Sequence, residues 1–269
     1  MAPEYAQFYE IFSQEDSSPK IIKINQYEYE ELQKANKGFY EKIKNQEERI
    51  LELEQMVHSS GNKVFVEDRY DQIYKIAYLK LKGIDDISEE NFENKFSENC
   101  NFSIHGNYSC GGLYGQLICT NITNEQDCKI ICLFDFDAEG YRRFEELESK
   151  KDNDEKLFSK KKGTISEGLY IKHSKIERYA LMLPIPERLK KYVSEKTSSD
   201  CFIEVETLLS EEYLKTNQKA ELRSEALPFY IMKDKQKKNF WKDLLIADKS
   251  HFEDFRPLFA QMEKIFNEE

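Results

Sequence analysis

The sequence predicts an α/β fold in which helices flank a parallel sheet, and three features support this prediction. Two short apolar runs, at 63–66 and 130–134, are bounded by polar residues, as buried strands are. Stretches with helical spacing follow them, at 70–81 and 140–148. Strands and helices that alternate at this spacing form βαβ units, and the strands of such units are parallel.

Residues 1–62 form an N-terminal segment dominated by a long predicted helix. Residues 1–20 contain turn formers and show no clear period, but a heptad pattern runs from 29 to 57 and ends at Ser59-Ser60-Gly61. A helix of roughly 28 residues is about 42 Å long. The pattern fits a coiled coil in a homo-oligomer, a docking arm for another subunit, or a helix folded back on its own domain.

Residues 63–150 form the predicted core, and residues 151–269 complete the domain with a mixed α+β region. Other elements expected in the core are an acidic loop or short helix at 84–100, a strand containing Phe102 and Ile104, a glycine-rich loop at 106–115, and a helix at 113–119. In the C-terminal region we expect paired strands at 168–173 and 178–183, a strand or helix start at 201–209, and a helical tail at 229–266.

The composition indicates a folded chain without a general affinity for nucleic acid. The 16 Tyr and 18 Phe supply core material that disordered chains lack. The formal charge of −11 excludes a passive DNA coat, which would be basic overall. Local basic faces remain at 160–162 and 233–238, although both runs also fit solvated loops.

Membrane insertion, secretion and zinc binding are not expected. No apolar run approaches the ~20 residues of a membrane span, and the N-terminus lacks a basic stretch followed by an apolar one. The six Cys include no CxxC pair and the four His are scattered, which is not the spacing of a zinc site. We therefore expect a cytoplasmic protein with reduced thiols.

Acidic residues follow both predicted strands at the point where each strand ends. Glu67 comes after the first strand, and Asp135 and Asp137 follow the second. Ligand sites of parallel sheets form outside the carboxyl ends of the strands. If the two strands are neighbours, these carboxylates converge and repel, and a hard cation such as Mg²⁺ relieves the repulsion. Either cluster alone also fits a helix cap, but the two together favour a metal site.

These segments resemble the motifs of Toprim domains, in which one strand ends in Glu and a later strand ends in Asp-x-Asp. V-F-V-E-D-R-Y-D (64–71) is similar to the first motif, and C-L-F-D-F-D-A-E-G (132–140) is similar to the second. The glycine-rich stretch at 106–115 lies where the family has small residues. Asp68 departs from the family pattern because it occupies the usual glycine position, which implies an altered turn.

The resemblance implies a catalytic role for Glu67, Asp135 and Asp137. Glu67 would be the general acid/base or a metal ligand, and the two aspartates would be metal ligands. The metal, Mg²⁺ or Mn²⁺, would activate a water or stabilise the charge on a phosphate.

The same resemblance suggests further ligands. Asp71 would be an outer ligand for a second ion, and Glu204, together with Glu206, would complete the site from the later region. Alternating surface acids on a strand are the ordinary explanation for the last two.

Among Toprim chemistries, nucleic-acid hydrolysis fits this chain. Primases and recombination mediators of the family carry zinc motifs that are missing here, and type IA topoisomerases need a large clamp for which there is no space. The resulting prediction is a Mg²⁺-dependent endonuclease that acts on DNA or RNA, with tRNA among the candidates.

Three later segments, at 178–186, 202–209 and 252–259, resemble OLD-like Toprim nucleases and the effector of the PARIS anti-phage system, which pairs with an ABC-type ATPase. This resemblance implies a toxic defence effector regulated by such a partner. The alternatives are a housekeeping RNA-maturation nuclease and a non-enzymatic Toprim scaffold subunit.

Overall fold

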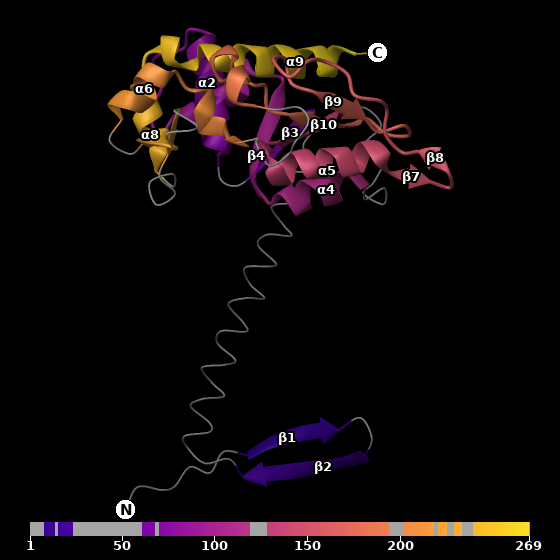
Figure 1. The fold of residues 1–269 in the computed structure, drawn as a ribbon. Coiled ribbons are helices and arrows are strands. Elements are labelled where there is room, and N and C mark those ends of the chain that lie inside the picture. The colour runs from indigo at the N-terminus through magenta and orange to yellow at the C-terminus, as the bar shows by residue number, and fades with distance from the viewer. Residues whose placement is uncertain are drawn as a thin grey trace, which may run out of the picture. The chain divides into compact units, whose positions relative to one another are not determined.

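A computed structural model describes much of the chain, which divides into two compact units, Met1–Ser60 and Gly61–Glu269 (Figure 1). The described residues are 8–13, 16–23, 61–67, 70–118, 128–193, 202–217, 220–224, 229–232 and 239–268. Each unit has secondary structure of its own.

The first unit contains an antiparallel pair of strands, β1 (Phe8–Ser13) and β2 (Asp16–Lys23). The sequence pattern did not predict this pair. The register shifts between Ile11 and Ser13, opposite the stretch that contains Pro19. Proline cannot donate a ladder hydrogen bond, so a strand that contains it is irregular at that point. The helix predicted at 29–57 lies outside the described residues.

The second unit is built on a sheet whose strand order is β4-β3-β5-β10-β9. The strands are β3 (Asn62–Glu67), β4 (Phe102–Tyr108), β5 (Ile130–Phe134), β9 (Tyr170–Lys172) and β10 (Arg178–Met182). β3 pairs in parallel with β4 and β5, and β10 pairs in parallel with β5. Only the edge strand β9 is antiparallel within this sheet. The predicted α/β class with a mainly parallel sheet is therefore confirmed.

Helices lie on both sides of this sheet (Figure 1). They are α2 (Asp71–Leu81), α3 (Phe92–Asn99), α4 (Cys110–Ile118), α5 (Ala138–Ser149) and α9 (Arg256–Asn267). α4 and α5 pack together over one face, whereas α2 and α9 lie on the other side. The helices predicted near 70–81, 113–119 and 140–148 correspond to α2, α4 and α5.

An aromatic cluster ties α9 to the core. The ring of Tyr78 on α2 lies edge-on to the rings of Phe96, Phe102 and Phe259, at centroid distances of 5.6, 5.7 and 5.2 Å. These rings come from α3, β4 and α9, so one buried tyrosine contacts elements from both ends of the unit. Edge-to-face pairs of this kind stabilise a core beyond the area that they bury.

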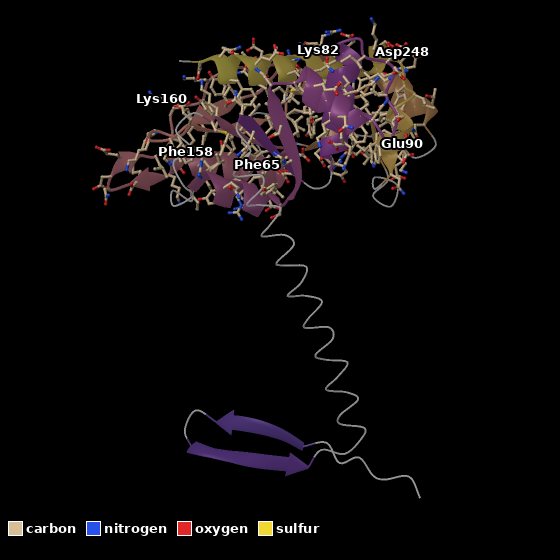
Figure 2. The ribbon with its side chains drawn as sticks, turned by 180° about the vertical axis from the view of Figure 1, so that it is seen from behind. Phe65, Lys82, Glu90, Phe158, Lys160 and Asp248 are labelled. Carbon is tan, nitrogen blue, oxygen red and sulfur yellow. The ribbon has the colours of Figure 1, made fainter. Side chains whose placement is uncertain are left out.

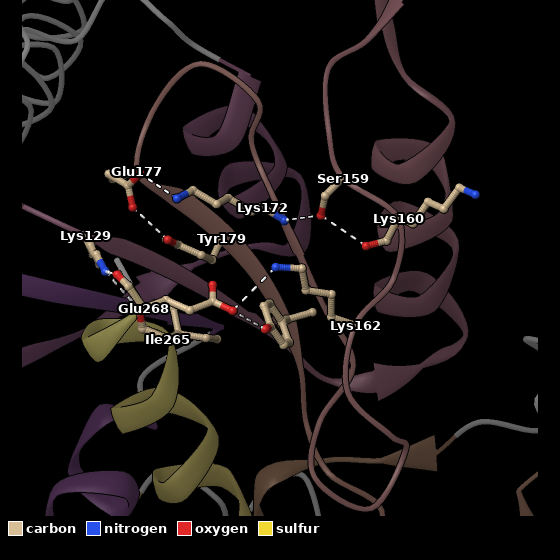
Figure 3. A network of polar contacts seen from close by, with 10 residues as sticks. Lys129, Ser159, Lys160, Lys162, Lys172, Glu177, Tyr179, Ile265 and Glu268 are labelled. Carbon is tan, nitrogen blue, oxygen red and sulfur yellow. Dashed lines mark hydrogen bonds and ion pairs between the residues drawn. The ribbon is translucent and has the colours of Figure 1, made fainter.

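The end of α9 is held by polar contacts (Figure 3). The Lys129 ammonium donates to the carbonyls of Ile265 and Phe266, at 3.3 and 3.2 Å. The Tyr170 hydroxyl donates to the Glu268 carboxylate at 2.7 Å. A cation at these carbonyls both satisfies acceptors that the helix leaves open and complements the negative end of its dipole.

The remaining elements are short, and all of them except β6 belong to the C-terminal region. They are β6 (Phe136–Asp137), β7 (Lys151–Asp152), β8 (Glu155–Lys156), η1 (Glu187–Tyr192), β11 (Phe202–Ile203), η3 (Val205–Leu208), α6 (Glu211–Thr216), β12 (Ala220–Leu222), β13 (Tyr230–Met232), α8 (Phe240–Leu244) and η4 (Lys249–Phe255). The predicted strands at 168–173 and 178–183 are paired, as β9 and β10. The stretch 201–209 holds both a strand and a helical turn.

Two parts of this region differ from the sequence prediction. The tail from 229 is not helical throughout, because β13 pairs with β12 before the helices begin. The charged stretch at 149–163 contains the β7–β8 hairpin, in which Asn153 and Asp154 have φ angles of 48° and 69°. Asn and Asp tolerate positive φ, which tight hairpin turns require.

Side chains sort by polarity between the interior and the surface (Figure 2). Phe65 and Phe158 are buried, whereas Lys82, Glu90, Lys160 and Asp248 are exposed. Among the described residues, no helix combines the length and the apolar character that crossing a membrane requires.

Candidate functional site

Glu67 and Asp135 meet at the carboxyl edge of the sheet because β3 and β5 are parallel neighbours. Val66 pairs with Leu133, so Glu67 and Asp135 leave their strands side by side. The backbone N–H of Asp135 donates to Oε1 of Glu67 at 3.3 Å. The convergence expected for neighbouring strands is therefore present for this pair.

Asp137 lies at the junction between the sheet and α5. Its backbone is extended, with φ −112° and ψ −177°, and its side chain caps the helix by accepting from the N–H of Gly140 at 2.7 Å. Asp137 therefore has a structural function as an N-cap, as the alternative interpretation of this acid expected.

The later region adds Glu204 and Glu206. β11 pairs antiparallel with β6, with Phe202 opposite Asp137, and this pairing carries the following residues toward Asp135. Both glutamates act electrostatically on Asp135, and Glu206 is only 2% exposed. We refer to Glu67, Asp135, Asp137, Glu204 and Glu206 as the carboxylate cluster.

Arg188 on η1 supports the segment that carries the two glutamates. Its guanidinium donates to the carbonyl of Thr207 and, at 2.7 Å, to that of Leu209. It also pairs with Asp254 on η4 at 3.3 Å. One side chain therefore connects η1, the end of η3 and η4 beside Glu206.

Burial and mutual repulsion raise the pKa values of the two aspartates in the cluster. Burial raises the pKa of Asp135 well above its ordinary value, and the charges of Glu67, Glu206, Glu204 and Asp137 raise it further. Burial also raises the pKa of Asp137, with contributions from nearby acids, while the Gly140 hydrogen bond opposes the shift. A bound cation would remove this bias, because it favours the ionised carboxylates.

Two side chains near the cluster were not predicted. Tyr74 is 2% exposed, and its pKa is raised first by burial and then by Asp135 and Glu67. The pKa of the Cys110 thiol, at the start of α4, is raised by burial and by Glu67. Tyr74 lies on α2, and no pattern in the sequence indicated that it faces the acids. Cys110 comes from the glycine-rich stretch, and no pattern in the sequence distinguishes it.

Asp71, a predicted outer ligand, is engaged elsewhere. Its carboxylate pairs with Lys75 at 2.9 Å, one turn along α2. Lys75 also pairs with Glu93 on α3 at 2.8 Å, and the lysine itself is only 8% exposed. The structure therefore brings Glu67, Asp135, Asp137 and Glu204 together, whereas Asp71 takes part in an ion-pair network between two helices.

The donor chemistry of the cluster fits a hard divalent cation, since every member offers carboxylate oxygens. The side chains do not form a closed coordination shell. In the part of the chain that the structure describes, no group of three or more His, Cys, Asp or Glu residues is arranged to hold a metal ion. Glu67 accepts from the Asp135 N–H, and Asp137 accepts from the Gly140 N–H.

Gly140 permits the close turn between the two aspartates and α5. A Cβ added at this position would lie 2.2 Å from the backbone oxygen of Asp135 and 3.2 Å from Oδ1 of Asp137. The first distance is far inside van der Waals contact, and the atom it meets is backbone, which cannot rotate away. Any side chain here therefore displaces Asp135 or the start of α5.

Gly140→Ala is expected to lower the free energy of unfolding by about 1–3 kcal/mol, because the clash forces the backbone to move. Gly115→Ala is the matched control: it lies within α4, and an added Cβ there meets nothing within 4 Å. Alanine is the better helix former, so the control should gain about 0.5–1 kcal/mol. Urea unfolding of both variants checks the prediction, and equal effects in the two helices would contradict it.

Asp135→Asn is expected to stabilise the metal-free protein increasingly as pH rises. The pKa of Asp135 is higher in the folded than in the unfolded state. Wild-type stability is therefore greatest below the unfolded pKa, about 3.9, and falls as pH rises through the folded pKa. Asparagine carries no charge at any pH, so its advantage grows over the same window.

Thermal melts in EDTA between about pH 5 and 8 measure this difference, which we expect to reach roughly a few degrees. Glu98→Gln, which changes an exposed acid on α3, is the control and should shift the melting temperature equally at every pH. An Asp135→Asn advantage that shrinks with rising pH would refute the electrostatic account of the cluster.

Comparisons with known proteins do not supply a family for this chain. No family model, no curated protein and no solved structure matches it. Conclusions about function therefore depend on the geometry and chemistry of the carboxylate cluster.

Proposed function

We propose that this chain is a metal-dependent, Toprim-type endonuclease that hydrolyses phosphodiester bonds. The observation that carries the proposal is that Glu67 and Asp135 lie side by side at the carboxyl edge of a parallel sheet, where the charges of Asp137, Glu204 and Glu206 act on Asp135. Separate stretches of chain supply these acids, and a fold gains no stability from crowding like charges in a buried place. A site that binds a cation and a phosphodiester explains the crowding.

Mg²⁺ or Mn²⁺, held by Asp135, Asp137, Glu67 and Glu204, would lower the pKa of a water and neutralise charge on the phosphate. Asp135 is the central ligand in this account, because the charges of all the other acids of the cluster act on it. Glu67 is the general acid/base: it lies at the end of β3, where its carboxylate can turn from the Asp135 N–H toward a water.

The Toprim assignment is supported by the order and placement of the elements. The Glu-bearing strand β3 and the Asp-x-Asp strand β5 are adjacent and parallel, with a helix after each. The second motif ends in a glycine, Gly140, for a physical reason: a Cβ added at this position would overlap the Asp135 carbonyl. The motif departure at Asp68 lies outside the described residues.

The role as a defence effector regulated by an ABC-type ATPase is proposed from the sequence resemblance. The three segments that carry it lie around the cluster: 178–186 contains β10, 202–209 contains Glu204 and Glu206, and 252–259 begins within η4. Arg188 links the second segment to the third through its bonds to the Thr207 carbonyl and to Asp254. A shared role of these segments in building the site would explain why they resemble the same proteins.

A non-enzymatic scaffold is the second candidate, and two hydrogen bonds within the cluster support it. Asp137 already caps α5, and Glu67 already accepts from the Asp135 backbone, so both acids have structural partners without a metal. The scaffold interpretation does not explain why Asp135 is buried among the other acids. It predicts that metal has no effect on the protein.

Cleavage of plasmid DNA and of total tRNA tests the proposed function. Wild-type protein should cut one of them in Mg²⁺ or Mn²⁺ and neither in EDTA. Glu67→Gln and Asp135→Asn should each lose about a hundredfold or more in rate, because each removes a group that acts on the reacting phosphate. Glu98→Gln should cut like the wild type. Cutting that survives EDTA, or that both site variants retain, would contradict the proposal.

A further inference from the structure

A pocket of about 480 Å³ opens beside η1 and is lined by basic and aromatic side chains. Arg188, Lys190 and Lys191 line it together with Tyr192 and Phe229, and it contains two acids. Its volume lies within the roughly 300–1,000 Å³ of small-molecule sites. Its lining holds three basic and two acidic side chains, in a chain whose formal charge is −11.

Arg188 links the pocket to the segment that carries Glu206. It belongs to the lining, and the same guanidinium donates to the carbonyls of Thr207 and Leu209, one and three residues after Glu206. The chain reaches η1 straight from the carboxyl end of β10, where Leu183 still donates to Phe134 of β5 at 2.9 Å. A polymer whose reacting phosphate lay at the cluster would therefore pass close to this pocket.

The side chains of the pocket offer an aromatic face and an exposed cation. The rings of Tyr192 and Phe229 lie 6.0 Å apart, and Phe229 is only 3% exposed, so it supports Tyr192 from the interior. The Lys191 ammonium lies 4.7 Å from the Tyr192 ring centre. The Lys190 charge is compensated by Glu187 and the Arg188 charge by Asp254, whereas Lys191 is exposed and its ammonium can leave the Tyr192 ring for a ligand.

We infer that this pocket binds one nucleotide of a single-stranded nucleic-acid substrate, with Lys191 at a phosphate and the base against Tyr192. The inference rests on the proposed function and identifies the substrate as a single strand. Proteins that bind single strands combine cations along the backbone with aromatic rings under the bases. In a duplex the faces of the bases are covered by their neighbours, so a duplex cannot use Tyr192 in this way.

The predicted basic faces are poorer candidates for this role. Lys161 pairs with Glu145 and Glu148 at 3.3 Å, and Lys162 pairs with Glu268 at 3.4 Å. Their charges are therefore largely used within the protein. The second run, 233–238, lies outside the described residues.

Fluorescence anisotropy with a labelled 12-nucleotide single strand in EDTA tests the inference without requiring cleavage. Lys191→Ala should weaken binding by roughly fivefold to tenfold and flatten the dependence of log K on log salt by about 0.7, the value for one phosphate contact on a single strand. Tyr192→Ala should weaken binding by about tenfold and leave that slope unchanged. A duplex of the same sequence should bind more weakly than the single strand.

Matched controls separate a specific pocket from general charge. Lys264→Ala removes one exposed lysine from α9, and Tyr192→Phe keeps the aromatic ring, so both should bind within about twofold of the wild type. Only variants that melt like the wild type are compared. Equal weakening by Lys191→Ala and Lys264→Ala, equal binding by Tyr192→Ala and Tyr192→Phe, or no binding by the wild type would overturn the inference.

The pocket inference and the nuclease assignment can fail separately, because binding and cleavage are measured in different experiments. If the wild type cuts nucleic acid and the pocket variants bind normally, the pocket inference fails and the nuclease assignment stands. If the pocket variants bind weakly but the wild type cuts nothing in Mn²⁺, the pocket binds nucleic acid and the nuclease assignment fails.

Discussion

Carboxylates that approach one another in a buried place must be protonated, hydrogen-bonded or neutralised by a cation, and this requirement governs the sheet edge of this protein. The parallel pairing of β3 and β5 places Glu67 beside Asp135, and the pairing of β11 with β6 adds Glu204 and Glu206. The backbone compensates in part, since the Asp135 N–H donates to Glu67. The rest of the cost appears as the raised pKa of Asp135.

Features distant in the sequence serve to hold this arrangement in place. Gly140 allows α5 to begin directly against the Asp135 carbonyl, so the helix and the acid cannot separate without breaking the cap at Asp137. Arg188 fixes the backbone just after Glu206 and is itself held by Asp254. The C-terminal region is therefore part of the site, because the pairing of β11 with β6 brings Glu204 and Glu206 toward Asp135.

Much of the sheet and its first acids could be predicted from the sequence, because local signals determine them. The apolar run before Asp135 and the helical spacing after Glu67 both result from burial. The order of apolar and polar residues in the sequence shows such burial directly. Glu204 was predicted from a resemblance, but its proximity depends on a strand pair of only two residues on each side, which is too short for a periodic signal. Asp71 looked like a ligand because it follows Glu67, yet its partner Lys75 lies one turn along the helix.

Other features could not be predicted because they depend on long-range packing. Tyr74 belongs to a helix in which every residue from Ile73 to Lys80 is buried, so the helical spacing at 70–81 did not indicate that Tyr74 faces the acids. The pocket beside η1 needs Phe229 to support Tyr192, and the two are separated by the whole η3–α6 region. The β12–β13 pair breaks a tail whose composition is that of a helix, because pairing between strands overrides local propensity.

Calorimetric titration of the metal-free protein with Mn²⁺ tests the central claim most directly, since it measures whether the clustered acids bind a divalent cation without requiring substrate or partner. The account predicts saturable binding by the wild type, loss of that binding in Asp135→Asn, and unchanged binding in Glu98→Gln. Binding should release protons at pH values below the raised pKa of Asp135, because the cation favours the ionised carboxylate. No heat beyond dilution, or binding that Asp135→Asn leaves unchanged, would contradict the account and favour a scaffold.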